Sequence, residues 1–187
     1  MKKGSIILIV IVAVLVIVIG GMVSSYNNLV SLEETVDKAY ADIDVQWARR
    51  ADLISNLVNT VKGYVEHEEN IIKNITDARE NLLNAESVED KAKANNELSS
   101  AINALMVIVE NYPDLKANEN FINLSDELAG TENRIANART TYNEAVEDYN
   151  SAVKKFPTNI LANMFGFEEK DYFEIEESKK DVPKVEF

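Results

Sequence analysis

The chain begins with a long uninterrupted run of apolar residues. Residues 6–19 are all Ile, Leu, Val or Ala, and no charged residue occurs from Gly4 to Leu32. As a helix, residues 6–23 would measure roughly 27 Å at about 1.5 Å per residue, close to the thickness of a bilayer core. The pattern therefore predicts a transmembrane anchor, whose lipid-facing residues include Ile6, Leu8, Val12, Leu15, Val18, Ile19 and Val23.

Charges on either side of this run predict its orientation. Lys2 and Lys3 precede it, whereas the first charges after it are acidic. Basic residues set membrane orientation far more than acidic ones, so we expect a single-pass protein with a cytoplasmic N-terminus and an extracytoplasmic remainder. The alternative is a secreted protein released by signal cleavage near Ser25, although signal cores usually span only about 7–15 residues.

Apolar residues recur at steps of three and four from Tyr26 to Phe156, which is the spacing of amphipathic helices. Pro113 is the one proline in this stretch. The clearest series predicts a heptad seam of the coiled-coil type, comprising Phe121, Leu124, Leu128, Thr131, Ile135, Ala138, Tyr142, Ala145, Tyr149, Ala152 and Phe156.

Local signals suggest where these helices begin and end. Ser87 with Asp90 resembles a capped helix start, and Pro113 should interrupt the helical backbone. Polar residues crowd around residues 52–55 and suggest a further break. With that break, the fold is all-α, with four helices in a long antiparallel up-and-down bundle after the transmembrane helix. Without it, one rod runs to about Ala85 and the bundle has three helices.

The last part of the chain has a different pattern. Pro157 should end the final long helix. A short apolar patch made of Ile160, Leu161, Met164, Phe165 and Phe167 follows, where Gly166 should end the helical backbone, and a charged segment comes next. We favour a cap on the bundle core as the role of this patch, over a position at the membrane surface. The predicted organisation is an anchor at residues 1–25, a bundle at 26–156, and a cap segment with a flexible acidic tail at 157–187.

Composition excludes several classes of function. The chain has no Cys and one His, which excludes disulfide scaffolds, Cys-ligated metal centres, thiol nucleophiles and any site that needs two imidazoles. Its net charge is −13, with 32 acidic and 19 basic residues. Nucleic acid is therefore not an expected partner, because phosphate binding needs clustered Lys and Arg.

His67 is the one residue that invites a metal or hydrolytic interpretation. The zincin pattern needs a second His at the position of Ile71, and a di-iron bundle needs Glu where Tyr64 stands. We therefore predict no catalytic residue, cofactor, metal or small-molecule substrate. The alternative is a metal-dependent or hydrolytic enzyme that uses His67 with Glu68 or Glu69.

Charged residues within the apolar seams are candidates for contacts with partners. They are Arg49, Arg50, Asp52, Glu132 and Arg134. Interhelical salt bridges that set the helix register are the favoured interpretation, because polar groups in bundle seams most often specify pairing. A partner-binding patch is the alternative. If Arg134 belongs to a buried pair, its replacement by Ala should be strongly destabilising.

Several sequence blocks together resemble the LemA family of bacterial membrane-anchored helical proteins. The blocks are residues 51–58, 60–64, His67-Glu68, 112–117, 131–136, Tyr142-Asn143, Tyr149-Asn150, Phe156-Pro157 and Gly166-Phe167. One departure is Ser55, where the family often has Pro. The resemblance implies a four-helix bundle without an assigned activity, and a magnetosome-associated branch of the family suggests a role in organising membranes.

These observations lead to one functional hypothesis. The chain is expected to be a non-enzymatic helical scaffold that is held at the bacterial membrane by its N-terminal helix. Its partners are expected to be the lipid bilayer, further copies of itself and other membrane proteins.

Overall fold

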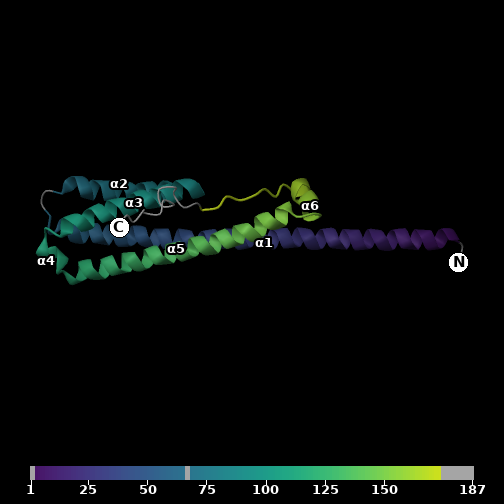
Figure 1. Cartoon of the computed structure of the whole chain (residues 1–187), viewed down its shortest axis with the longest axis horizontal. Helices are drawn as coiled ribbons and strands as arrows, with labels where there is room; N and C mark the ends of the chain where they lie inside the picture. Colours follow the sequence, from purple (N-terminus) through teal and green to yellow (C-terminus); the bar gives the residue numbers. More distant parts are fainter. Residues whose placement is uncertain (1–2, 66–67, 174–187) are drawn as a thin grey trace, which may run out of the picture. The chain divides into compact units, whose positions relative to one another are not determined.

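A computed structural model describes residues 3–65 and 68–173, apart from the side chains of Lys3 and Ser5. Every regular element in these residues is an α-helix (Figure 1). The helices are α1 (Lys3–Lys62), α2 (Glu69–Asn84), α3 (Val88–Val109), α4 (Pro113–Lys116), α5 (Glu119–Lys154) and α6 (Thr158–Phe165).

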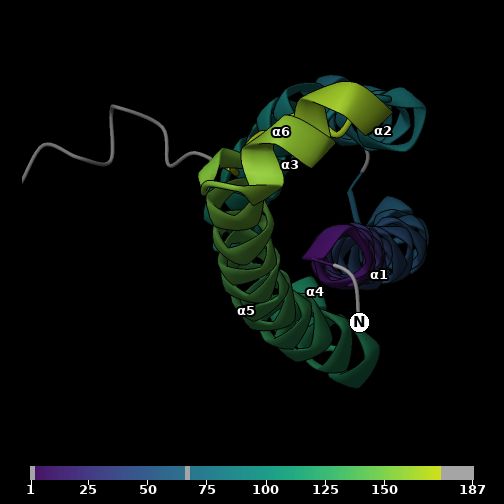
Figure 2. The same cartoon turned by 90° about the vertical axis from the view of Figure 1, so that its right-hand side faces the viewer.

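The chain divides into two compact units. The first unit comprises Met1–Ala39 and Asn143–Asp171, and the second comprises Tyr40–Tyr142 and Tyr172–Phe187. Helices α1 and α5 contribute to both units, whereas α6 lies in the first unit and α2, α3 and α4 lie in the second. Within the second unit, α2 and α3 pack against each other, as Figure 2 also shows.

Helix α1 is continuous, so the predicted break at residues 52–55 is wrong. The Ser55 hydroxyl donates a hydrogen bond to the Ala51 carbonyl, 3.2 Å away, and this local bond keeps a polar residue inside the helix. The alternative rod reaching Ala85 is also wrong, because α1 ends at Lys62 and α2 begins at Glu69. After α1 the chain turns at Gly63, whose N–H donates to the Thr60 carbonyl.

Other predicted boundaries are confirmed. The Ser87 hydroxyl accepts a hydrogen bond from the Asp90 N–H at 3.0 Å and caps α3. Pro113 occupies the first turn of the short helix α4, where its missing N–H has no consequence. Gly166 ends α6 with a φ of 78°, a left-handed conformation that glycine adopts readily.

The apolar stripe predicted on α5 is buried over most of its length. The buried seam residues are Phe121, Leu128, Thr131, Ile135, Tyr142, Ala145 and Tyr149. Phe156 is 80% exposed because α5 has already ended at Lys154, so the prediction extended the seam too far. Val146 and Asn150 are buried as well, which widens the stripe beyond a strict heptad.

None of the apolar side chains described at the beginning of α1 is buried. Its large side chains from Ile6 to Ile19 are 47–73% exposed, and its apolar window has a mean hydropathy of 3.5. By length and composition α1 could cross a membrane, as predicted. A cleaved signal sequence near the N-terminus meets the same criterion of length and apolar composition.

The two isoleucines of α5 provide a test of the packed seam. Ile135 is fully buried and Ile122 is 44% exposed. We expect Ile135→Ala to lower the free energy of unfolding by about 2–5 kcal/mol, because it removes packed methyl groups and leaves a cavity. The matched control Ile122→Ala should cost about 1 kcal/mol or less. Urea unfolding of the full chain in detergent, followed by circular dichroism, measures both, and equal losses would contradict the assignment of the seam.

Candidate functional site

A buried arginine joins three helices of the second unit. Arg50 on α1 is 4% exposed, and its Nη1 donates to the Oδ1 of Asn95, which is fully buried on α3. Its Nη2 donates to the Ser99 hydroxyl at 2.9 Å. On the other side, Arg50 Nη1 lies 2.6 Å from Glu132 Oε2 on α5. One side chain therefore specifies how α1, α3 and α5 align.

Glu132 is the counter-ion of two arginines. Burial lowers the pKa of Arg50, and the Glu132 carboxylate opposes this shift. Burial likewise lowers the pKa of Arg139, again against the effect of Glu132. The Glu132 side chain is 44% exposed, so solvent screens part of these interactions. The arrangement stabilises positive charge within the helix interface and offers no group with the properties of a general base.

The five predicted interaction residues occupy different environments. Arg50 and Glu132 form the pair described above, while Arg49 lies 3.3 Å from Glu127 in an exposed ion pair. Asp52 and Arg134 are exposed. Arg134 is therefore not the buried member of a pair, and its replacement should have little effect on stability.

Aromatic and cationic side chains form a second cluster, which sequence reasoning missed. Trp47 is 3% exposed, and its ring lies 5.8 Å from that of Phe173. The Lys91 Nζ lies 5.4 Å from the Trp47 ring, and the Arg139 guanidinium lies 5.6 Å from the Phe173 ring. These are cation–π distances. Extending the apolar spacing of α1 beyond Ile43 would have identified Trp47, but no local signal indicates Phe173.

Lys91 also forms an ion pair with Asp44 across the α1–α3 interface. Burial lowers the pKa of Lys91, but hydrogen bonds to Asp44 and Tyr40 outweigh that effect and leave the pKa raised. The ammonium therefore stays charged at neutral pH and links the two helices.

Lys170 holds the segment after α6 within the first unit. Its Nζ lies 2.7 Å from Asp37 and 3.4 Å from Glu33, both on α1. Its backbone N–H donates to the side chain of Asn150, whose amide donates back to the Lys170 carbonyl. Asn150 is 4% exposed, so this reciprocal pair satisfies a buried amide on α5.

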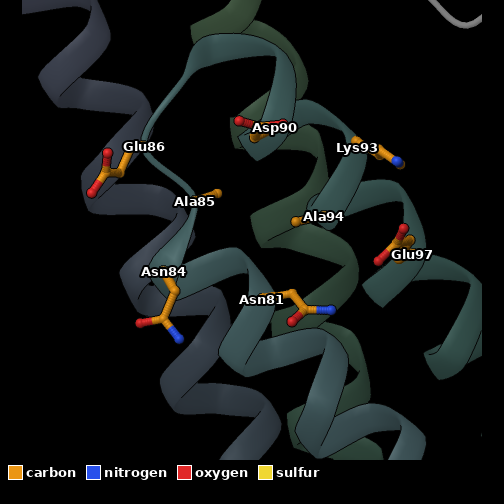
Figure 3. Close-up of a pocket in the computed structure, with 8 residues that line it drawn as sticks. All are labelled: Asn81, Asn84, Ala85, Glu86, Asp90, Lys93, Ala94 and Glu97. Carbon is orange, nitrogen blue, oxygen red and sulfur yellow. The ribbon is translucent and has the colours of Figure 1, made fainter.

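A shallow polar pocket opens beside the turn between α2 and α3 (Figure 3). Its volume is about 490 Å³. Asn81, Asn84, Ala85, Glu86, Asp90, Lys93, Ala94 and Glu97 line it. These amides and charges include no nucleophile paired with a base, so the pocket supports no particular reaction.

The candidate metal site around His67 lies outside the described residues. Within residues 3–65 and 68–173, no group of three or more metal-ligating side chains comes together. The alternative enzyme hypothesis gains no support from this part of the chain.

Comparison with known proteins identifies relatives along nearly the whole chain. A model of the LemA family matches residues 39–187. Magnetosome protein MamQ 2 of Paramagnetospirillum magneticum is 26% identical over 211 residues, covering 98% of this chain and 77% of that protein. Magnetosome protein MamQ of Magnetospirillum gryphiswaldense is 26% identical over 201 residues. Protein LemA of Metamycoplasma hominis is 26% identical over 137 residues, covering 73% of this chain and 63% of that protein.

Neighbouring arginines on α1 provide a test of the buried network. Lysine cannot reproduce the planar fork of Arg50, so Arg50→Lys should leave a buried acceptor unpaired and cost about 1–3 kcal/mol of unfolding free energy. The control Arg49→Lys affects an exposed pair and should change stability by about 0.5 kcal/mol or less. Urea unfolding of both variants in detergent measures the difference. A similar loss for both would show that Arg50 does not hold the helices together.

Lys170 predicts a dependence of stability on pH. Burial lowers its pKa, but Asp37 and Glu33 together outweigh burial and leave the pKa raised. The folded state therefore binds the Lys170 proton more tightly than the unfolded state does. The stabilisation that Lys170 gives to the folded state is complete below the ordinary lysine pKa of about 10.4, and it is lost as the pH rises through the raised pKa. We expect Lys170→Met to lower the melting temperature at neutral pH and to differ much less from the unmodified chain at about pH 11.5. Lys155→Met, at an exposed lysine, is the control, and a pH-independent effect of Lys170→Met would contradict the assignment.

Proposed function

The chain belongs to the LemA family, and on that premise we propose that it is a non-enzymatic scaffold anchored in the bacterial membrane. It organises partner proteins, or further copies of itself, at the bilayer surface. The observation that carries the proposal is the continuity of α1. Its beginning is apolar and exposed, and the same helix continues without a break into a part whose residues are packed against other helices. Membrane attachment and the packed helical part of the chain thus share one continuous helix.

The names of the relatives support a role at a membrane. MamQ proteins are named as magnetosome proteins, and neither that name nor LemA denotes a reaction. The polar groups buried between the helices are used for pairing, as Arg50 illustrates. An anchored domain of this kind acts by position, because confinement to a bilayer raises the local concentration of its binding surfaces.

We further infer that the packed helices run up and down in an antiparallel bundle with coiled-coil-like seams. The short connection at residues 85–87 supports antiparallel neighbours for α2 and α3. Lys2 and Lys3 favour a single pass with the N-terminus in the cytoplasm and the bundle outside. The exposed charges Arg49, Asp52 and Arg134 remain candidates for contacts with partners.

Thiol labelling in intact cells tests the anchor and its orientation. The chain has no Cys, and Val107 on α3 is 71% exposed. A Val107→Cys variant should fractionate with membranes and react with a membrane-impermeant maleimide before lysis. Labelling only after lysis would contradict the orientation. Recovery from the medium of a chain beginning near residue 25 would contradict the anchor.

Cross-linking of the same cells tests the scaffold role. We expect a short amine-reactive linker to capture dimers or higher species, or a reproducible partner, in the membrane fraction. A chain that stays monomeric and captures nothing in cells, and is also monomeric in detergent, would overturn the scaffold proposal while leaving the anchor intact.

A further inference from the structure

Helix α6 exposes an apolar face to solvent. None of its eight residues is charged, and the side chains of Ile160, Met164 and Phe165 are 56–57% exposed. Leu161 and Ala162 are buried, and Phe165, which lies on their side of the helix, also contacts α1. A surface helix of a water-soluble protein normally turns polar or charged residues outward. The outer face of α6 therefore has the character of a surface that another apolar phase covers.

The position of α6 within the first unit identifies that phase. The Tyr26 ring on α1 lies 4.9 Å from the Phe165 ring and 5.7 Å from the Phe167 ring. An apolar cavity of about 210 Å³ lies between the two helices and is lined by Met22, Val23, Tyr26, Leu161 and Phe165. Helix α6 is thus docked on the last turn of the apolar run of α1 and on the tyrosine just after it.

Tyrosine at the end of a transmembrane run is typical of the membrane–water interface, where its ring is apolar and its hydroxyl stays hydrated. If residues 6–23 cross the bilayer, Tyr26 lies at the depth of the lipid headgroups. The helix packed on Tyr26 then lies at the same depth. Phe156, which is 80% exposed just before α6, extends the apolar surface at this level.

We propose that α6 is an interfacial membrane helix, which is the alternative to the cap on the bundle core that the sequence pattern favoured. Its exposed side chains Ile160 and Met164, together with Phe156, insert into the boundary between headgroups and acyl chains of the bilayer that α1 crosses. This inference rests on the proposed anchor. It adds a second, peripheral attachment to lipid at the end of α5, far from the first in sequence.

Charges near α6 indicate that the attachment is apolar rather than electrostatic. Lys154 at the end of α5 forms an ion pair with Glu169 at 2.6 Å, and Lys170 is paired with Asp37 and Glu33. These ion pairs offset the charges of Lys154 and Lys170, so that exposed Lys155 would add only a small attraction to anionic headgroups. Insertion should therefore occur in zwitterionic bilayers as well as in anionic ones.

Fluorescence quenching by lipid tests the insertion. Since the chain has no Cys, Ile160→Cys and Met164→Cys can each carry a nitrobenzoxadiazole label on the full chain in phosphatidylcholine vesicles. Lipids with a nitroxide near the top of the acyl chain should reduce both signals roughly twofold, because an interfacial helix buries its apolar face about 5–10 Å deep. Both side chains are already exposed, so the labels should leave the packing unchanged.

Two control positions separate this inference from the anchor. Val12→Cys reports on the transmembrane run and should be quenched by nitroxides placed deep in the acyl chain. Val45, the site of a Val45→Cys control, is also apolar and is 62% exposed, but it follows Val23 by 22 residues and lies outside the apolar run. Its signal should stay unchanged.

The outcomes are distinct. Quenching at Val12 with no quenching at Ile160 and Met164 would overturn the α6 inference and leave the anchor standing. No quenching at Val12 would overturn the anchor itself, and the α6 inference with it. Blue-shifted but unquenched emission at Ile160 and Met164 would mean that protein, such as a second copy of the chain, covers α6, and would overturn the lipid assignment.

Discussion

Helix α1 has two different surroundings along one continuous backbone, and the rest of the structure depends on this constraint. Its beginning is apolar on every side and exposes that surface, which water solvates unfavourably. From Leu29 onward only one stripe is buried, including Val36, Ile43 and Ile54. Because the backbone hydrogen bonds of a helix are internal, its backbone polar groups are satisfied both in lipid and in a packed protein interior.

Several ion pairs connect α1 with other parts of the chain. Lys170 reaches Asp37 and Glu33, Lys91 reaches Asp44, and Arg50 reaches Glu132 from the α1 side. Apolar seams alone permit helices to slide by a heptad with little cost. A buried guanidinium that needs partners on both α3 and α5 makes such a shift expensive, since it would leave the charge unpaired.

The acidity of the chain determines which of its surfaces could contact a membrane. A net charge of −13 repels anionic lipid surfaces. Contact with a bilayer would then come from apolar surface, such as the start of α1 and the exposed Ile160 and Met164 of α6.

The sequence by itself determined the features that local physics controls. The apolar run at residues 6–19, the three- and four-residue spacing on α5, the Ser87 cap and the stop at Gly166 each depend on residues close together in the chain. The local crowding of polar residues at 52–55 led to the wrong prediction of a helix break. A helix tolerates polar side chains on its solvated face, and the Ser55 hydroxyl bonds back to the backbone of its own helix.

Only the tertiary structure decided which of two adjacent arginines is buried, that Arg139 and Phe173 join Trp47, and that α6 packs on Tyr26. These contacts join residues up to 139 positions apart in the pairing of Tyr26 with Phe165. Spacing along one helix defines a face but not its neighbour. The neighbour follows from the packing of all the helices together.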